Sequence, residues 1–329
     1  MSLFLKKIAL YISLIFLLNL AVGAWLKSYE SADLKEAKIF FSDLRWEDYY
    51  NLKEPIDALI LGSSHAYRSY HPATIKEEVG FENAVFNFGS SAQSPVTGFF
   101  ILEEVLKKHK PKVVILDLYV MALTSDDQLD NGRINYHPMQ TGGVKKDFLR
   151  EGFGFSEQIK LLFFPTYVYR DHFKHKVNKL LGRSYLPIGK GQYDKYGFAF
   201  NTDTLALPKL QYDNQFSRFD IEADQMTEKN LAYAQKIIER CQYANIPLIL
   251  MTSPMPEQSV AFIQKYPQIS QQFADLAIEY DLPFYDFNLK RIAEVKDEFH
   301  YFDDDHLNLS GAKIFSKSAG NLIKKQLTQ

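Results

Sequence analysis

Short apolar runs that alternate with helix-length amphipathic segments are the feature that most constrains how this chain can fold. In the first part of the chain, residues 56–62, 83–89 and 111–120 are predicted to be buried strands, and residues 72–80 and 94–110 between them are predicted to be helices. This alternation is typical of a parallel sheet with helices on both faces. We therefore predict an α/β fold, a flavodoxin-like three-layer sandwich with a mostly parallel sheet.

The same rhythm returns near the C-terminus. A helix capped by Thr227 precedes a predicted strand at residues 247–254, and another helix precedes a short strand at 283–288. The last helix covers residues 309–327. We expect the two α/β halves to form one sheet.

A long insertion, at about residues 122–225, separates these halves. Its turn residues are scattered and its periodicity is weak, although residues 156–182 are predicted to be helical. That helical stretch mixes apolar runs with basic residues. It is either a helical lid, or a surface that rests on the membrane or on a membrane partner, or an amphipathic helix whose basic face is solvated. The sequence leaves these readings open.

The N-terminus carries one long apolar segment. Lys6 and Lys7 precede residues 8–26, and Lys27 closes the segment. As a helix it would be about 28 Å long, close to the thickness of a hydrocarbon core. The lysine pair favours a cytoplasmic N-terminus. We expect an uncleaved single-pass anchor with an extracytoplasmic domain, periplasmic or at the cell surface, and a cleaved signal peptide is the alternative.

The predicted organisation is therefore a membrane anchor at residues 1–27, a lead-in helix at 28–55, and an α/β domain at 56–329 that contains the insertion. The formal net charge of −2 gives no indication of a nucleic-acid partner. Cys241 is the only cysteine, so an internal disulfide is impossible.

Polar motifs lie where predicted strands end, which is where active sites form in open α/β sheets. The sequence GSSH at residues 62–65 follows the first strand, and DDDH at residues 303–306 precedes the last helix. A serine becomes a nucleophile when a base removes its proton, and His306 is the candidate base. Asp303, three residues earlier, is placed to orient that histidine.

These blocks resemble those of the SGNH (GDSL-like) hydrolase superfamily. The family's first block, G-D-S, corresponds to Gly62-Ser63-Ser64, so the resemblance makes Ser64 the nucleophile. The final block, D-x-x-H, matches Asp303 and His306. The resemblance covers roughly residues 56–120 and 245–325, and it implies an SGNH hydrolase-like fold with serine-dependent acyl chemistry.

The resemblance also implies an oxyanion hole. Two of the sequence blocks that form it in the family differ in this chain. In the sequence NFGSSA, the spacing from Asn87 and Gly89 places Ala92 where the family has a glycine that donates its N–H. The third block, G-x-N-D, is replaced by LYVM at residues 118–121, so its asparagine is missing. We expect Asn87 to substitute as an oxyanion donor. Arg68 is expected at the same rim, to meet a substrate anion or saccharide, or to pair with Glu77 or Glu78.

The anchor, the GSS block and the missing G-x-N-D look like a membrane-anchored subgroup that includes alginate O-acetylation and teichoic acid D-alanyl transfer proteins. That likeness implies an acyltransferase or esterase acting on O-acyl groups of a cell-surface glycan, beside a membrane-bound O-acyltransferase. The alternatives are a non-catalytic SGNH-fold glycan-binding or assembly module, or a secreted carboxylesterase. No cofactor is expected. DDDH with His300 nearby offers metal-ligand types, but its spacing matches no zinc pattern, so we expect no metal.

Overall fold

The computed structural model describes residues 3–27, 41–125, 129–182, 191–205 and 224–328. Its body is an α/β fold around a five-stranded parallel sheet with the strand order β2-β1-β3-β6-β7. The strands are β1 (Ile56–Leu61), β2 (Ala84–Asn87), β3 (Val113–Asp117), β6 (Leu248–Thr252) and β7 (Phe284–Asp286). Every predicted strand is present, and the predicted fold class is confirmed.

The strand order places a topological switch point in the middle of the sheet. β1 has β2 on one side and β3 on the other, so the chain winds away from β1 in both directions. β1, β3 and β6 are buried along their whole length, which requires layers on both faces of the sheet. In such sheets the loops that leave the carboxyl ends at the switch point form a crevice.

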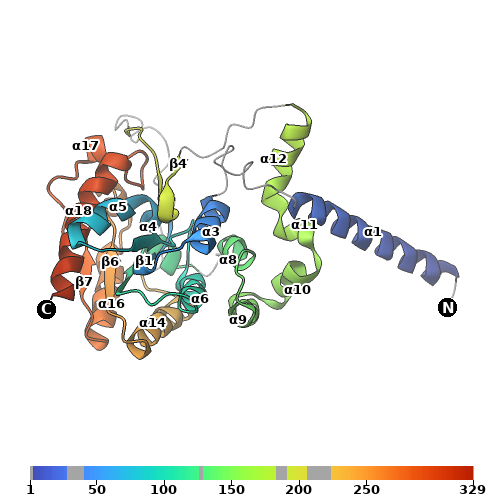
Figure 1. Cartoon of the computed structure of the whole chain (residues 1–329), viewed down its shortest axis with the longest axis horizontal. Helices are drawn as coiled ribbons and strands as arrows, with labels where there is room; N and C mark the ends of the chain where they lie inside the picture. Colours follow the sequence, from blue (N-terminus) through green and yellow to red (C-terminus); the bar gives the residue numbers. More distant parts are fainter. Residues whose placement is uncertain (1–2, 28–40, 126–128, 183–190, 206–223, 329) are drawn as a thin grey trace.

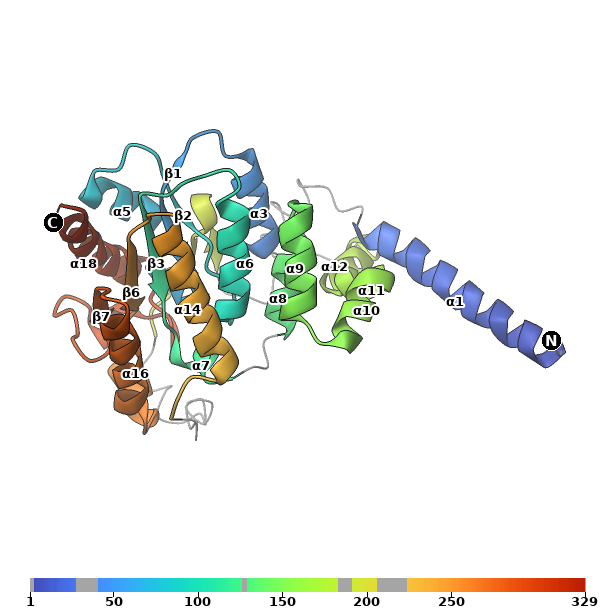
Figure 2. The ribbon, with the colours of Figure 1, turned by 90° about the horizontal axis from the view of Figure 1, so that it is seen from below.

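Helices cover both faces of the sheet, as Figures 1 and 2 show. One face carries α6 (Pro95–Val105), α14 (Glu228–Tyr243) and α16 (Tyr266–Glu279), and the other carries α5 (Pro72–Val79) and α18 (Leu309–Leu327). Phe100, Ile237 and Phe273 belong to the apolar cluster on the first face. Ile75 and Phe315 belong to the cluster on the second face. Burial of these helix faces is the main term that holds the three layers together.

Helix boundaries follow local capping chemistry. The Thr227 hydroxyl accepts the Asn230 N–H at 3.2 Å and starts α14, as predicted. Gly80 adopts a left-handed φ of 84° and ends α5. The Asn308 side chain accepts the Gly311 N–H at 3.0 Å and starts α18.

The insertion forms a set of helices beside the sheet. They are α8 (Leu129–Tyr136), α9 (Gly142–Gly152), α10 (Phe155–Phe163), α11 (Pro165–Val168) and α12 (Arg170–Leu180). Residues 156–182 are largely helical, as predicted, but the helix is interrupted because Pro165 disfavours helical geometry at Phe164, whose φ and ψ are −123° and 79°. α9 packs on α6, where the rings of Phe148 and Phe100 stack with centroids 4.7 Å apart. Residues 206–223 of the predicted insertion lie outside the described residues.

The N-terminal segment is one continuous helix, α1 (Leu3–Lys27), which extends away from the α/β body (Figure 1). Among the described residues it is the one helix long and apolar enough to cross a membrane. α3 (Phe41–Asn51) lies in the predicted lead-in region, and residues 28–40 lie outside the described ones. Trp46 and Tyr49 of α3 are buried against Phe88, so α3 is part of the body.

Short elements complete the described chain. They are α4 (Ser64–Ser69), α7 (Val120–Leu123), β4 (Gln192–Tyr193), a 3₁₀ turn (Lys195–Gly197), β5 (Ala199–Phe200), α15 (Glu257–Phe262) and α17 (Asp297–His300).

Two buried aspartates of the sheet have pKa values shifted in opposite directions. At the end of β3, burial raises the pKa of Asp117 to about 6, although Ser253 donates its N–H and hydroxyl to the carboxylate. In β1, burial also opposes ionisation of Asp57, but hydrogen bonds from Asn83 and from Lys112 leave its pKa below the ordinary value.

We expect the two aspartates to give opposite pH dependences of stability. A carboxyl whose pKa is raised on folding makes the folded state less stable as pH rises from about 4 to about 6. Asp117→Asn should therefore stabilise the fold at pH 7 by about 1 to 3 kcal/mol. Asp57 has a lowered pKa and stabilises above its unfolded pKa, so Asp57→Asn should destabilise at pH 7. Urea unfolding at several pH values measures both effects. An Asp117→Asn variant that is no more stable than wild type at pH 7 contradicts the assignment.

Candidate active site

The turn after β1 determines which of the two adjacent serines faces outward. Gly62 has a φ of +148°, and a Cβ there would lie 2.8 Å from the Cβ of Asp117, so glycine is required. Ser63 caps α4, and its hydroxyl accepts the His65 N–H at 3.2 Å. Ser64 is consequently the first residue of the helix, with its hydroxyl directed away from the cap.

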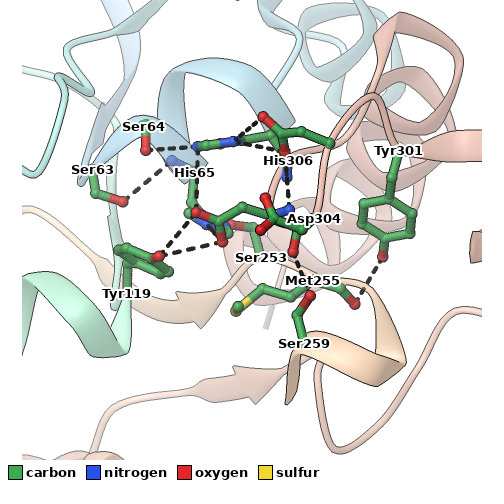
Figure 3. Close-up of polar contacts among 12 residues, drawn as sticks. Ser63, Ser64, His65, Tyr119, Ser253, Met255, Ser259, Tyr301, Asp304 and His306 are labelled. Carbon is green, nitrogen blue, oxygen red and sulfur yellow. Dashed lines mark hydrogen bonds and ion pairs between the residues drawn. The ribbon is translucent and has the colours of Figure 1, made fainter. Parts of the chain in front are cut away.

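Ser64, His306 and Asp303 form a hydrogen-bonded chain. The Ser64 Oγ lies 2.8 Å from the His306 Nε2 (Figure 3). The other ring nitrogen, Nδ1, lies 3.1 Å from both carboxylate oxygens of Asp303. The three predicted residues are thus brought together, with the imidazole between a hydroxyl and a carboxylate. This order is the one that general-base activation of a serine needs.

The Asp303 carboxylate is held in its charged form. Burial opposes its ionisation, but the attraction of His306 and the hydrogen bonds from that residue bring the pKa of Asp303 below its ordinary value. Its Oδ1 also accepts the backbone N–H groups of Asp305 and His306, at 2.9 and 2.7 Å. A fixed carboxylate at Nδ1 leaves the Nε2 lone pair directed at Ser64.

His306 is held by a tight turn before α18. Tyr301 and Leu307 form an antiparallel bridge, and the Phe302 N–H donates to the His306 carbonyl at 3.1 Å. The Phe302 ring also stacks on the imidazole, with centroids 5.6 Å apart and planes 14° apart. The ring orientation is therefore fixed by packing as well as by Asp303.

A second histidine–carboxylate pair, absent from the predicted site, flanks the first. The His65 Nε2 lies 2.7 Å from the Asp305 Oδ1, and the Tyr119 hydroxyl donates to both oxygens of that carboxylate at 3.2 and 3.0 Å. The rings of His65 and Tyr119 stack with centroids 4.0 Å apart. The Asp305 Oδ2 lies 3.9 Å from the His306 Nε2, so the two pairs are electrostatically coupled. The repeated aspartates of DDDH were the available signal for this pair.

Ligand atoms of His65, Asp305 and His306 lie within 4.8 Å of one another, close enough to surround a cation. However, His65 is hydrogen-bonded to Asp305, and His306 to Ser64. The arrangement as it stands suits proton transfer. His300, considered as a ligand from the sequence, instead accepts the Lys296 N–H at its Nδ1, at 2.8 Å.

The predicted oxyanion role of Asn87 is wrong. Its Nδ2 donates to the carbonyls of Ala66 and Tyr70, at 2.8 and 3.1 Å, so neither amide hydrogen is left for a substrate. Gly89 is occupied too, because its N–H donates to the Asn87 Oδ1 at 3.0 Å. Both residues tie the loop after β2 to α4. Ala92, with a left-handed φ of 50°, remains a candidate donor through its N–H.

Arg68 lies beside the proposed base but not in an ion pair with Glu77 or Glu78. Its guanidinium carbon is 4.7 Å from the centre of the Phe302 ring, which in turn stacks on His306. The Arg68 side chain is buried, and its Nη1 has no hydrogen-bond partner among the described residues. The predicted contact of Arg68 with an anion or saccharide stays a prediction, and Nη1 is the atom left to make it.

A buried polar network, unforeseen from the sequence, holds the loop after β2. Gln93 accepts the Gly62 N–H at 3.1 Å and donates to the Ser90 hydroxyl at 2.9 Å. That hydroxyl also accepts from Asn131 and Asn135 of α8, at 3.2 and 2.9 Å. The insertion therefore buttresses the loop that carries Ala92.

The lead-in helix closes this network from the other side. Arg45 and Trp46 of α3 both donate to the Asn135 Oδ1, at 3.0 and 3.2 Å. Arg45 also donates to the Gly89 carbonyl. Asn135 is fully buried and its amide is satisfied on both sides. One side chain of the insertion thus joins α3 to the loop after β2.

A cavity of about 250 Å³ lies between α3, α4 and the insertion helices. Ser64 and His306 are not in its lining, but Tyr67, one turn after Ser64, and Ser91, next to Ala92, are. The rest of its wall combines aromatic and charged side chains, among them Phe41, Arg45, His137 and His172.

No family model and no curated protein matches the chain. Among solved structures, a putative acylhydrolase from Bacteroides fragilis NCTC 9343 is 12% identical, covers 87% of this chain and 95% of its own, and has a TM-score of 0.41. A putative lipolytic protein of the G-D-S-L family from Desulfitobacterium hafniense DCB-2 is 11% identical (81% and 99% covered, TM-score 0.39). A GDSL-like lipase from Bacteroides thetaiotaomicron VPI-5482 is 10% identical (88% and 97% covered, TM-score 0.40). At these scores the likeness carries no functional inference, so function is argued from this chain's own geometry.

We expect Asn135→Ala to destabilise the fold by about 2 to 4 kcal/mol, because it leaves the buried donors of Arg45 and Trp46 without an acceptor. Asn321→Ala, at an exposed position of α18, is the matched control and should change stability little. Urea unfolding monitored by circular dichroism gives both values. Equal stabilities for the two variants would show that the network does not hold the loop.

Proposed function

We propose that this chain is a membrane-anchored, extracytoplasmic serine acyltransferase or esterase of the SGNH type. Its proposed substrates are O-acyl groups of a cell-surface glycan. The observation that carries the proposal is the 2.8 Å contact between the Ser64 Oγ and the His306 Nε2, with Asp303 on the opposite ring nitrogen. A serine used only as a helix cap needs no such partner, and Ser63 already fills that role.

The proposed reaction proceeds through an acyl-enzyme. The Ser64 Oγ attacks the acyl carbonyl carbon while its proton passes to the His306 Nε2. The tetrahedral intermediate collapses, the ester C–O bond breaks, and His306 returns the proton to the departing alcohol oxygen. A glycan hydroxyl, or water, then attacks the acyl carbon and gives its proton to the His306 Nε2. The bond between the acyl carbon and the Ser64 Oγ breaks, and His306 returns the proton to Ser64. Asp303 stabilises the imidazolium in both halves of the reaction.

Two backbone groups are the proposed oxyanion donors. Ser64 is the first residue of α4, so its N–H has no partner within that helix. The Ala92 N–H is the second candidate. The family's third donor is missing, because Val120 stands at the position of its asparagine. The preceding residue, Tyr119, directs its hydroxyl at Asp305. Loss of one such donor typically slows acyl transfer about 100- to 1,000-fold, which suits an enzyme that receives an activated acyl group.

The way in which α1 packs favours an anchor over a cleaved signal sequence. The Asn19 Nδ2 donates to the Phe163 carbonyl at 3.0 Å, and the His172 Nδ1 lies 3.3 Å from the Leu26 carbonyl. Leu26 is buried. Cleavage after residue 24 would remove Asn19 from these contacts. An uncleaved anchor keeps the serine close to a membrane surface, where a membrane-bound O-acyltransferase is the proposed partner and acyl source.

The cavity beside the site supports a glycan as the acceptor. Phe41 and Tyr67 offer aromatic surface, while Ser91 and Arg45 line the same space. Aromatic faces combined with hydrogen-bonding groups suit the mixed surface of a sugar. Arg68, on the other side of Tyr67, is the proposed contact for an anionic group of the substrate.

We expect a fluorophosphonate probe to label the full-length protein in detergent micelles, and Ser64→Ala to abolish the labelling. Turnover of a chromogenic acetyl ester should fall about 10⁴-fold or more in that variant. Ser63→Ala is the matched control. It removes only the cap bond to His65 and should keep its labelling, with stability lowered by about 1 kcal/mol.

Labelling that persists in Ser64→Ala contradicts the proposal. An unlabelled wild-type protein would favour the alternative, a non-catalytic glycan-binding module. The engagement of Asn87 and Gly89 in the fold is the observation that favours that alternative. Acetate release measured with and without an added glycan acceptor separates transfer from hydrolysis.

We expect titration of Asp303 not to lower the labelling rate between neutral and mildly acid pH, since the lowered pKa of that carboxyl keeps it ionised. Asp303→Asn should reduce the rate about 10³-fold or more, because its amide N–H would donate to the His306 Nδ1 and leave the ring proton on Nε2, facing Ser64. The pH–rate profile of labelling measures both effects. A wild-type-like rate in Asp303→Asn would remove Asp303 from the mechanism.

A further inference from the structure

We infer that the corner between α10 and α11, with the apolar faces of α10 and α12, inserts into the outer lipid leaflet beside α1. The surface consists of the exposed apolar side chains Phe155, Leu162, Phe163, Phe164, Phe173, Leu180 and Leu181. We call it the apolar foot. The inference depends on the membrane-anchor part of the proposed function and is independent of the proposed chemistry.

The first observation is how far along α1 the corner is attached. The Asn19 side chain donates to the Phe163 carbonyl and also accepts from Thr166, and Gly23 lies against Pro165. Asn19 is eight residues before Lys27, which is about 12 Å along the helix axis.

The second observation fixes the position of α1 in a bilayer. The apolar stretch between Lys7 and Lys27 is about 28 Å long as a helix, which leaves almost no slack against a hydrocarbon core of about 30 Å. Lys27 then marks the outer boundary. A corner bonded to Asn19 consequently lies below that boundary, at the level of the outer-leaflet acyl chains.

The contacts at the membrane boundary agree with this depth. Lys176 of α12 donates to the Trp25 carbonyl, and the rings of Trp25 and Phe173 meet edge to face, with centroids 6.4 Å apart. α12 runs across the direction of α1 in Figure 1, so it lies along the expected membrane surface. Tryptophan and basic residues at this level are typical of the interface between lipid and water.

The exposed apolar side chains of the foot indicate that another apolar surface binds there. Phe155 is 78% exposed, Leu162 is 57% exposed and Phe163 is 52% exposed, all within α10. Groups of large apolar side chains on a water-facing surface mark interaction sites. Acyl chains are the occupant favoured here, because the foot is continuous with the face of α1, whose apolar side chains are also exposed.

The test is site-directed spin labelling of the full-length chain in vesicles of phosphatidylcholine and phosphatidylglycerol. Cysteines replace Leu162 in the foot, Ile12 in α1 and Ile278 on α16, and the native Cys241 is buried. The measured quantity is the ratio of the label's accessibility to oxygen to its accessibility to a water-soluble nickel chelate, and this ratio is high where the label is in lipid. We expect a severalfold higher oxygen-to-nickel ratio at Leu162 than at Ile278, close to the ratio at Ile12.

Three results would overturn the inference. If the oxygen-to-nickel ratio at Leu162 resembles the ratio at Ile278 while the ratio at Ile12 indicates lipid, then the apolar foot is not inserted, although α1 is an anchor. If the nickel chelate reaches a label at Ile12, then α1 is not in the membrane either. A Leu162 label shielded from both reagents indicates a second copy of the chain rather than lipid. Fluorophosphonate labelling of the same samples reports the proposed chemistry separately.

A second variant tests the docking of the foot on α1. Gly23→Leu should separate α1 from α11, since even a Cβ there would lie 2.4 Å from the Cβ of Pro165. Ala21→Leu, at an exposed position of the same helix, is the matched control. We expect the oxygen-to-nickel ratio at Leu162 to fall in Gly23→Leu only. An equal ratio in the two variants would contradict the docking.

Discussion

The close packing of three loops at the carboxyl ends of β1, β2 and β3 is the constraint on which the rest of the site depends. Gly62 joins all three: its N–H donates to Gln93, its carbonyl accepts the Ser90 N–H, and Asp117 lies beneath it. No larger residue fits that space, because its Cβ would overlap the Asp117 side chain. With this turn in place, α4 starts at Ser64 and its hydroxyl points toward His306.

The insertion is structurally part of the site. Through Asn131 and Asn135 its helix α8 holds the loop after β2, and through α11 and α12 it packs on α1. The same inserted segment therefore links the apolar helix α1 to the proposed oxyanion loop. Within this network the amide of Asn135 is satisfied on both sides, whereas the buried Arg45 Nε has no hydrogen-bond partner among the described residues.

Local patterns predicted what depends on neighbouring residues. The strands and the Thr227 cap follow from periodicity and from capping chemistry within a few residues. Asn87 was misread because the sequence cannot show that the carbonyls of α4 lie within reach of its amide. The helical expectation for residues 156–182 is confirmed, and the break at Phe164 has a local cause, the proline at position 165, which was present in the sequence.

The sequence by itself determined the α/β alternation, the single apolar N-terminal helix, and the set Ser64, Asp303 and His306. It did so because burial patterns and short motifs are written in consecutive residues. Only the tertiary structure brought the Ser64 hydroxyl within 2.8 Å of the His306 ring and placed Asp305 on His65 beside it. Those outcomes depend on side chains up to 242 positions apart, whose distances are fixed only when the loops at the sheet edge pack together.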